Sequence, residues 1–116
     1  MEYRIMHNDP NSDTDGTGLK GYMTATYAKL MEMFGYPCQG DGYKIDAKWE
    51  IKFEDDTVAT IYNWKNGKNY NGADGIPREE ITEWHIGGYD DKSIKNMNLV
   101  MPDSNVHCYQ DHDYGF

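Results

Sequence analysis

The sequence predicts an α+β fold, in which a small antiparallel sheet of three or more strands packs with two helices. Residues 48–54 alternate apolar and charged side chains, which is the period of a half-buried strand, and a stretch rich in β-branched and aromatic residues follows them closely. Apolar side chains recur at helical spacing once before and once after these stretches. Consecutive strands flanked by helices are typical of the α+β class.

A single domain, 1–116, is expected, because 116 residues can bury one modest core. Within it we expect a polar loop at 8–21, a folded core at 23–100 and a polar tail at 102–116. No apolar run approaches the ~20 residues that cross a bilayer, and the first residues lack the pattern of a signal peptide. We therefore expect a cytoplasmic protein without a membrane partner, whose two cysteines are reduced thiols.

The first helix is predicted to follow Thr24, whose hydroxyl can cap it, and to end at Gly35. Its apolar face is predicted to comprise Met23, Tyr27, Leu30, Met31 and Phe34. The second helix is predicted to begin at Asp90 or Asp91 and to stop before Pro102. Its apolar face is predicted to comprise Ile94, Met97, Leu99 and Met101.

The strands 48–54 and 57–64 are predicted to form a hairpin around a two-residue turn at Asp55 and Asp56. The predicted cross-strand pairs are Phe53 with Val58, Ile51 with Thr60, and Trp49 with Tyr62. This register leaves Ala59 and Ile61 on the opposite face from those pairs. The second strand would then carry apolar groups on both faces, which predicts a central strand.

A long loop, 65–78, is predicted to lead into a third strand, 80–86, which Gly87 and Gly88 are expected to end. A loop of this length in a small domain is more often functional than idle. The loop is therefore the first place to look for binding residues.

The chain has a formal net charge of −9, from 11 basic and 20 acidic residues. This excess argues against a nucleic-acid polymer as partner, because such binding depends on Lys and Arg that neutralise many phosphates. The acidic side chains can simply keep the protein soluble. Alternatively, they can imitate a nucleic acid and block a protein that binds DNA or RNA.

Flat rings and cations are concentrated around the 65–78 loop, where they predict a site for a flat, anionic ligand. Aromatic rings can stack on purines, and lysine and arginine can contact phosphates. Large aromatics on strands are also common core residues, which remains an alternative for Trp84. The predicted ligand-binding residues are Tyr62, Trp64, Lys65, Lys68, Tyr70, Arg78, Trp84 and His85.

No recognised catalytic grouping accompanies these residues. As a general base, His85 would need an orienting carboxylate, for which Glu83 or Asp90 could serve. No serine or cysteine stands in a nucleophile motif, and no second histidine follows at a phosphodiesterase-like spacing. We therefore expect no catalytic residue and no enzymatic activity, although hydrolysis of the ligand through His85 remains a third hypothesis.

The tail contains His107, Cys108 and His112, together with Asp111 and Asp113. These side chains are possible zinc ligands, but their spacing matches none of the usual ligand pairs. We expect neither a metal nor a cofactor.

Three strings, WEIKF at 49–53, VATIYNWK at 58–65 and ITEWHIGG at 81–88, resemble a widespread family of small bacteriophage proteins, the fourth-named anti-CBASS sponges. The resemblance covers about residues 23–100. It implies a homotetramer that sequesters a cyclic-nucleotide or related immune signal in pockets and does not cleave it. The expected ligand is a signal such as a cyclic dinucleotide or a cyclic ADP-ribose, bound in the infected bacterial host.

An alternative function is an acidic DNA mimic that inhibits a host nuclease or a CRISPR effector. This hypothesis predicts that separate carboxylates form one surface. The acidic residues concerned are Asp13, Asp15, Asp55, Asp56, Asp90 and Asp91.

Overall fold

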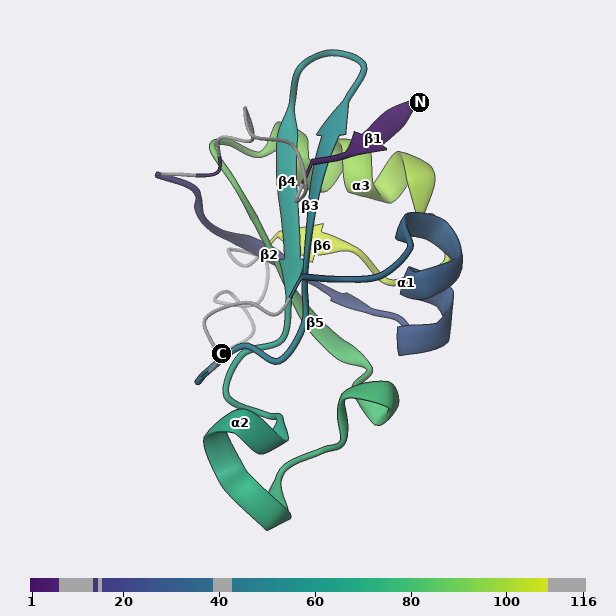
Figure 1. Cartoon of the computed structure of the whole chain (residues 1–116). Helices are drawn as coiled ribbons and strands as arrows, with labels where there is room; N and C mark the ends of the chain where they lie inside the picture. The colour runs from purple at the N-terminus through teal and green to yellow at the C-terminus, as the bar shows by residue number, and fades with distance from the viewer. Residues whose placement is uncertain (7–13, 15, 39–42, 109–116) are drawn as a thin grey trace, which may run out of the picture.

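A six-stranded antiparallel sheet with α-helices packed beside it forms the described part of the protein (Figure 1). The computed structural model describes residues 1–6, 14, 16–38 and 43–108. The predicted α+β class is therefore confirmed. No helix among these residues combines the length and the apolar character needed to cross a membrane.

Every pair of neighbouring strands in the sheet is antiparallel. The strands lie in the spatial order β1 (Tyr3–Ile5), β3 (Lys48–Phe53), β4 (Val58–Tyr62), β5 (Glu83–Gly88), β2 (Gly18–Thr24) and β6 (His107–Cys108). The helices are α1 (Tyr27–Phe34), α2 (Lys68–Asn71) and α3 (Lys92–Val100), with short 3₁₀ turns η1 (Gly72–Asp74) and η2 (Arg78–Glu80). Helices α1 and α3 lie on the same side of the sheet, and α2 lies beyond its end (Figure 1).

The hydrophobic core lies between the sheet and helices α1 and α3. The indoles of Trp49 and Trp84 meet edge to face at its centre, 5.4 Å apart. Each indole N–H donates to a backbone carbonyl, Trp49 to Gly35 and Trp84 to Ala25, so both rings are buried without an unsatisfied donor.

The β3–β4 hairpin forms as predicted, but its predicted register is wrong by one residue. Trp49 pairs with Ile61 and Ile51 with Ala59. Asp56 adopts a left-handed conformation (φ 67°), and its N–H donates to the Phe53 carbonyl, so the turn holds three residues in place of two. A shift of one residue exchanges the faces of a strand. Ala59 and Ile61 therefore point into the core, and Tyr62 points to the other face.

Two glycine-rich segments that were predicted as loop or strand end belong to strands. Strand β2 begins at Gly18, inside the predicted 8–21 loop. Strand β5 continues through Gly87 and ends at Gly88. Glycine is required at both positions by close packing: a Cβ on Gly88 would lie 2.6 Å from the side chain of Ser93, and one on Gly87 would lie 2.5 Å from Thr60 Oγ1. The rest of the predicted loop, apart from residues 14 and 16–17, lies outside the described residues.

The predicted start of the first helix is also corrected. Thr24 ends β2, and Thr26 is the N-cap of α1, where its hydroxyl accepts a hydrogen bond from Lys29 N–H. The two threonines are separated by one alanine, and the sequence alone does not separate them. In α3 the predicted start is confirmed at Asp91, but Leu99 is 58% exposed and does not belong to the buried face.

The predicted core boundaries were too narrow at both ends of the chain. Strand β1 lies outside the predicted 23–100 core, yet it pairs with β3 at the edge of the sheet. Strand β6 lies in the predicted tail and pairs with β2. The segment 65–78 contains α2, η1 and the start of η2, and it is not a structureless loop.

The tip of the β3–β4 hairpin is tied to α3 by a carboxylate. Both Oδ atoms of Asp55 accept hydrogen bonds from Asn96 Nδ2 at 3.0 Å, and Thr57 N–H also donates to Asp55. These hydrogen bonds lower the pKa of Asp55 from 3.8 to about 2, and the bond from Asn96 has the largest effect.

Asp55 is therefore expected to contribute stability that is present above its unfolded pKa of 3.8 and is lost as the pH falls towards about 2. In urea titrations from neutral pH to about pH 2, Asp55→Asn should flatten the decline in unfolding free energy across this acidic window. An unchanged pH profile in the variant would show that this carboxylate does not set acid stability.

Candidate ligand-binding surface

Four rings from four adjacent strands form a row on the face of the sheet opposite α1 and α3. We call this set, Tyr62 of β4, His85 of β5, Tyr22 of β2 and His107 of β6, the ring row. The strand register places each ring directly beside the next. The ring centroids are 5.5 Å apart for Tyr62 and His85, 5.0 Å for His85 and Tyr22, and 5.8 Å for Tyr22 and His107.

The indole of Trp64 extends the ring row beyond the end of β4. It stacks on His85 with an interplanar angle of 24° and a centroid distance of 6.4 Å, and it meets Tyr62 edge to face at 6.3 Å. Trp64 is 39% exposed, whereas Trp49 and Trp84 are buried. Of the three indoles, this is the one that a ligand can reach.

Two lysine ammonium groups lie over the Trp64 ring. Lys44 Nζ is 5.3 Å and Lys65 Nζ is 5.9 Å from its centroid. Lys65 Nζ also lies 5.6 Å from the centroid of the Tyr70 ring. The ring centroids of Tyr70 and Tyr43 are 5.1 Å apart. Lys65 N–H donates to the Lys44 carbonyl, which holds the two lysines on adjacent backbone segments. We call the ring row together with Trp64, Lys44, Lys65, Tyr70 and Tyr43 the ring-and-cation surface.

The buried side chain of Asn63 fixes the backbone that carries Trp64 and Lys65. Its Oδ1 accepts hydrogen bonds from the N–H groups of Asp46 and Ala47, and its Nδ2 donates to Asp46 Oδ1 and Asn66 Oδ1. Asp46 in turn accepts a hydrogen bond from the N–H of Asn69 in α2. Two segments that are distant in the sequence are therefore joined through one amide, beside the backbone that carries Trp64 and Lys65.

Replacing Asn63 with alanine is expected to lower the free energy of unfolding by about 2–3 kcal/mol, because buried N–H groups lose their acceptor. Urea denaturation measures this loss. Asn69→Ala is the matched control, since the exposed Asn69 side chain makes one long hydrogen bond of 3.4 Å, to Ile45 O. Equal stability of the two variants would contradict the role assigned to Asn63.

Burial shifts the pKa values of two groups in the ring row. Desolvation lowers the pKa of His85 below its ordinary value of 6.5. Desolvation, together with the neighbouring Tyr22, raises the pKa of Tyr62 above 10.0. Both rings are therefore uncharged at neutral pH, which suits stacking contacts with a flat heterocycle.

The ring-and-cation surface contains five of the eight predicted ligand-binding residues. These are Tyr62, Trp64, Lys65, Tyr70 and His85. Sequence reasoning missed Tyr22, Tyr43, Lys44 and His107. Tyr22 lies just beyond the predicted 8–21 loop, and His107 lies in the predicted tail. No clear signal in the sequence identified Tyr22, because Gly18–Thr24 does not alternate cleanly and its strand contains a β-bulge between Leu19 and Gly21.

Three predicted residues are placed elsewhere. Trp84 is buried in the core at 1% exposure, because side chains alternate along β5 and its neighbour His85 takes the other face. The Arg78 guanidinium lies 5.4 Å from the ring of Tyr27, a residue of α1, and pairs with Glu79. Lys68 is exposed on α2, and none of the ring contacts found among the described residues includes it.

The carboxylates that could orient His85 have other partners. Asp90 Oδ1 accepts a hydrogen bond from Lys92 N–H at the start of α3, and Glu83 accepts one from the Thr24 hydroxyl at 3.4 Å. Within the described ranges, no three His, Cys, Asp or Glu side chains are grouped closely enough to hold a metal ion. The tail residues 109–116, including His112, lie outside these ranges.

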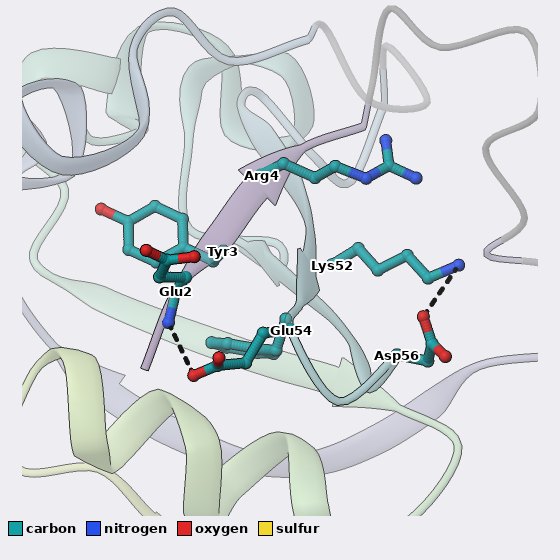
Figure 2. A pocket seen from close by; sticks show the side chains of 7 residues that line it. Glu2, Tyr3, Arg4, Lys52, Glu54 and Asp56 are labelled. Atoms are coloured by element: carbon teal, nitrogen blue, oxygen red, sulfur yellow. Dashed lines mark hydrogen bonds and ion pairs between the residues drawn. The ribbon is translucent and has the colours of Figure 1, made fainter.

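Two hollows lie away from the ring-and-cation surface. One, of about 320 Å³, lies over β1 and β3 and is lined mainly by charged side chains (Figure 2). The other, of about 180 Å³, lies between the β3–β4 turn and the start of α3.

The ring-and-cation surface offers stacking faces and positive charge at one place, and the arrangement suits recognition of a flat, anionic molecule. Comparison with known proteins adds no relative: no family model, no curated protein and no solved structure matches this chain.

Proposed function

We propose that this protein binds a nucleotide signal at the ring-and-cation surface and withholds it without cleaving it. In this function it is a bacteriophage immune-evasion protein that acts in the infected bacterial host, in line with its resemblance to the anti-CBASS sponges. The ligand class is a cyclic oligonucleotide, such as a cyclic dinucleotide, or a cyclic ADP-ribose.

The observation that carries the proposal is the position of Trp64. Its indole is exposed, is supported from below by His85, and has two lysine ammonium groups within 6 Å of its centroid. A stacked base gains about 1–3 kcal/mol, and lysines beside the base can pair with phosphate oxygens. A nucleotide is a common ligand that carries a flat base and phosphate oxygens together.

Sequestration is favoured over catalysis by the surroundings of His85. The imidazole is packed between rings, and Asp90 and Glu83 have partners of their own. A protein that withholds a signal must compete with a host receptor, which calls for nanomolar affinity, about −12 kcal/mol. Such affinity is easier to reach in pockets between subunits, where two chains enclose one ligand. The proposed form of the protein is therefore a homo-oligomer, such as a tetramer.

Calorimetry with cyclic dinucleotides, cyclic trinucleotides and cyclic ADP-ribose isomers tests this function. Tight binding of one of them, followed by recovery of the intact molecule after heat denaturation, is the expected result. Absence of binding to every ligand of the panel contradicts it, and recovery of a hydrolysed product would establish the enzymatic alternative.

One observation favours the acidic-mimic alternative. Asp55, Asp56 and Asp90 line the same hollow of about 180 Å³, so carboxylates from two distant segments do converge. Asp91 follows Asp90 directly, whereas Asp13 and Asp15 lie outside the described residues. Affinity capture from a host lysate discriminates: a stoichiometric nuclease or CRISPR effector that is lost on Asp55→Lys favours mimicry over ligand sequestration.

A further inference from the structure

Strand β1 forms one edge of the sheet, and no described strand lies beyond it. Met6 N–H donates to the Glu50 carbonyl and Glu54 N–H donates to the Glu2 carbonyl, so the even-numbered residues of this segment bond inward to β3. In an antiparallel ladder the alternate residues bond outward. The backbone groups of Tyr3 and Ile5 therefore point away from β3, in the arrangement that can accept another strand.

Like charges lie opposite each other in the β1–β3 pair and at the next position along the chain. Arg4 lies directly opposite Lys52, and the same register continues to Glu2 opposite Glu54. Like charges directly opposite each other destabilise a strand pair. Figure 2 shows the result: Arg4 and Lys52 extend together at one end, where Asp56 pairs with Lys52, and Glu2 and Glu54 lie together at the other. Two adjacent patches of opposite sign therefore stand at the edge of the sheet.

We propose that the β1 edge pairs antiparallel with the β1 edge of a second copy of this chain, so that Glu2 of each copy lies opposite Arg4 of the other. In a two-fold symmetric pair the same patch meets itself, which requires self-complementary charge. A register centred on Tyr3 provides it. The carboxylate patch of one copy then meets the cation patch of the other twice.

The hydrogen-bonding pattern restricts the alternatives. Because Tyr3 and Ile5 carry the outward backbone groups, they must pair with outward groups of the other copy. Three registers satisfy this: Tyr3 with Tyr3, Tyr3 with Ile5, and Ile5 with Ile5. The last places Arg4 opposite the apolar Met6 of the other copy and gains no opposite-charge pair. The second places Arg4 opposite Arg4 of the other copy, which like-charge repulsion disfavours. Charge therefore selects the register centred on Tyr3.

The hollow of about 320 Å³ fits the same partner. Its lining includes Glu2, Arg4, Lys52, Glu54 and Asp56, three carboxylates against two cations. Asp56 already pairs with Lys52, at 3.8 Å. In the proposed pair, Arg4 of the second copy lies opposite Glu2 at the rim of this hollow, and Glu2 of the second copy lies opposite Arg4.

Charge-reversal variants of the full chain test the interface by sedimentation equilibrium over a concentration series, without any ligand. Wild type is expected to dimerise. Arg4→Glu alone and Glu2→Arg alone each place like charges opposite one another twice, and each should raise the dissociation constant at least about tenfold. An equimolar mixture of the two variants restores both opposite-charge pairs and should form a heterodimer. Lys95→Glu, which makes the same charge change at an exposed position on α3, should leave dimerisation intact.

Circular dichroism of each variant establishes that it is folded before sedimentation. A wild type that stays monomeric at every concentration overturns the proposal, as do folded single variants that dimerise like wild type or a mixture that fails to associate. The experiment measures assembly in the absence of nucleotide. Failure of the proposed β1 interface is therefore distinguishable from failure of the proposed ligand-binding function.

Discussion

Replacing Trp84 with alanine is expected to lower the free energy of unfolding by about 3–5 kcal/mol, a large part of the stability of a small domain. The indole is 1% exposed, packs edge to face on Trp49, and donates to the Ala25 carbonyl. Its removal leaves a cavity at the centre of the core and a carbonyl without its donor. Urea denaturation followed by circular dichroism measures the effect.

This prediction separates the two roles that the sequence left open for Trp84. A stability loss of less than about 1 kcal/mol would be too small for a buried tryptophan and would contradict its placement in the core. The conservative variant Trp84→Phe keeps a ring but lacks the indole N–H. Its free energy of unfolding should lie between those of wild type and Trp84→Ala.

Replacing Trp64 with alanine is expected to weaken binding of the nucleotide signal by about fivefold to 150-fold, since one stacked base is worth about 1–3 kcal/mol. The fold should be preserved, because this indole is 39% exposed and lies beyond the end of β4. Calorimetry with the ligand selected from the panel measures the affinity, and thermal unfolding measures the stability.

Trp64→Ala and Trp84→Ala form a matched pair, the same chemical change on opposite faces of one sheet. Tyr36→Ala is a third variant, which removes a 79% exposed ring from the segment after α1. Only Trp64→Ala should lose affinity while keeping the wild-type melting temperature. Wild-type affinity in this variant would remove Trp64 from the site, and a large fall in melting temperature would place its ring in the core.

The elements that follow a clear period could be predicted from the sequence. The alternation of Trp49, Ile51 and Phe53 identified β3 and its buried face correctly. The partner strand was recognised, but its register depends on the left-handed conformation of Asp56. A glycine at this position would have indicated such a conformation, whereas an aspartate does not. A turn longer by one residue moved Ala59 and Ile61 into the core.

The site was predictable only where its residues are close in sequence. Trp64 and Lys65 adjoin β4, and they were identified from the loop that follows. Tyr22 and His107 reach the same surface through pairing of β2 with β5 and β6, contacts that no local pattern encodes. Trp84 and His85 are adjacent in the chain, and only the pleat of β5 assigns one to the core and the other to the ring row.

The indole N–H resonances of the three tryptophans provide the most direct measurement of the central claim. Trp49 and Trp84 donate to backbone carbonyls inside the core, whereas Trp64 lies on the ring-and-cation surface. In ¹H–¹⁵N spectra recorded during titration with the cyclic nucleotides, we predict that the Trp64 indole signal moves with saturation while the other two stay in place. A titration that leaves the Trp64 signal unmoved would contradict binding at this surface.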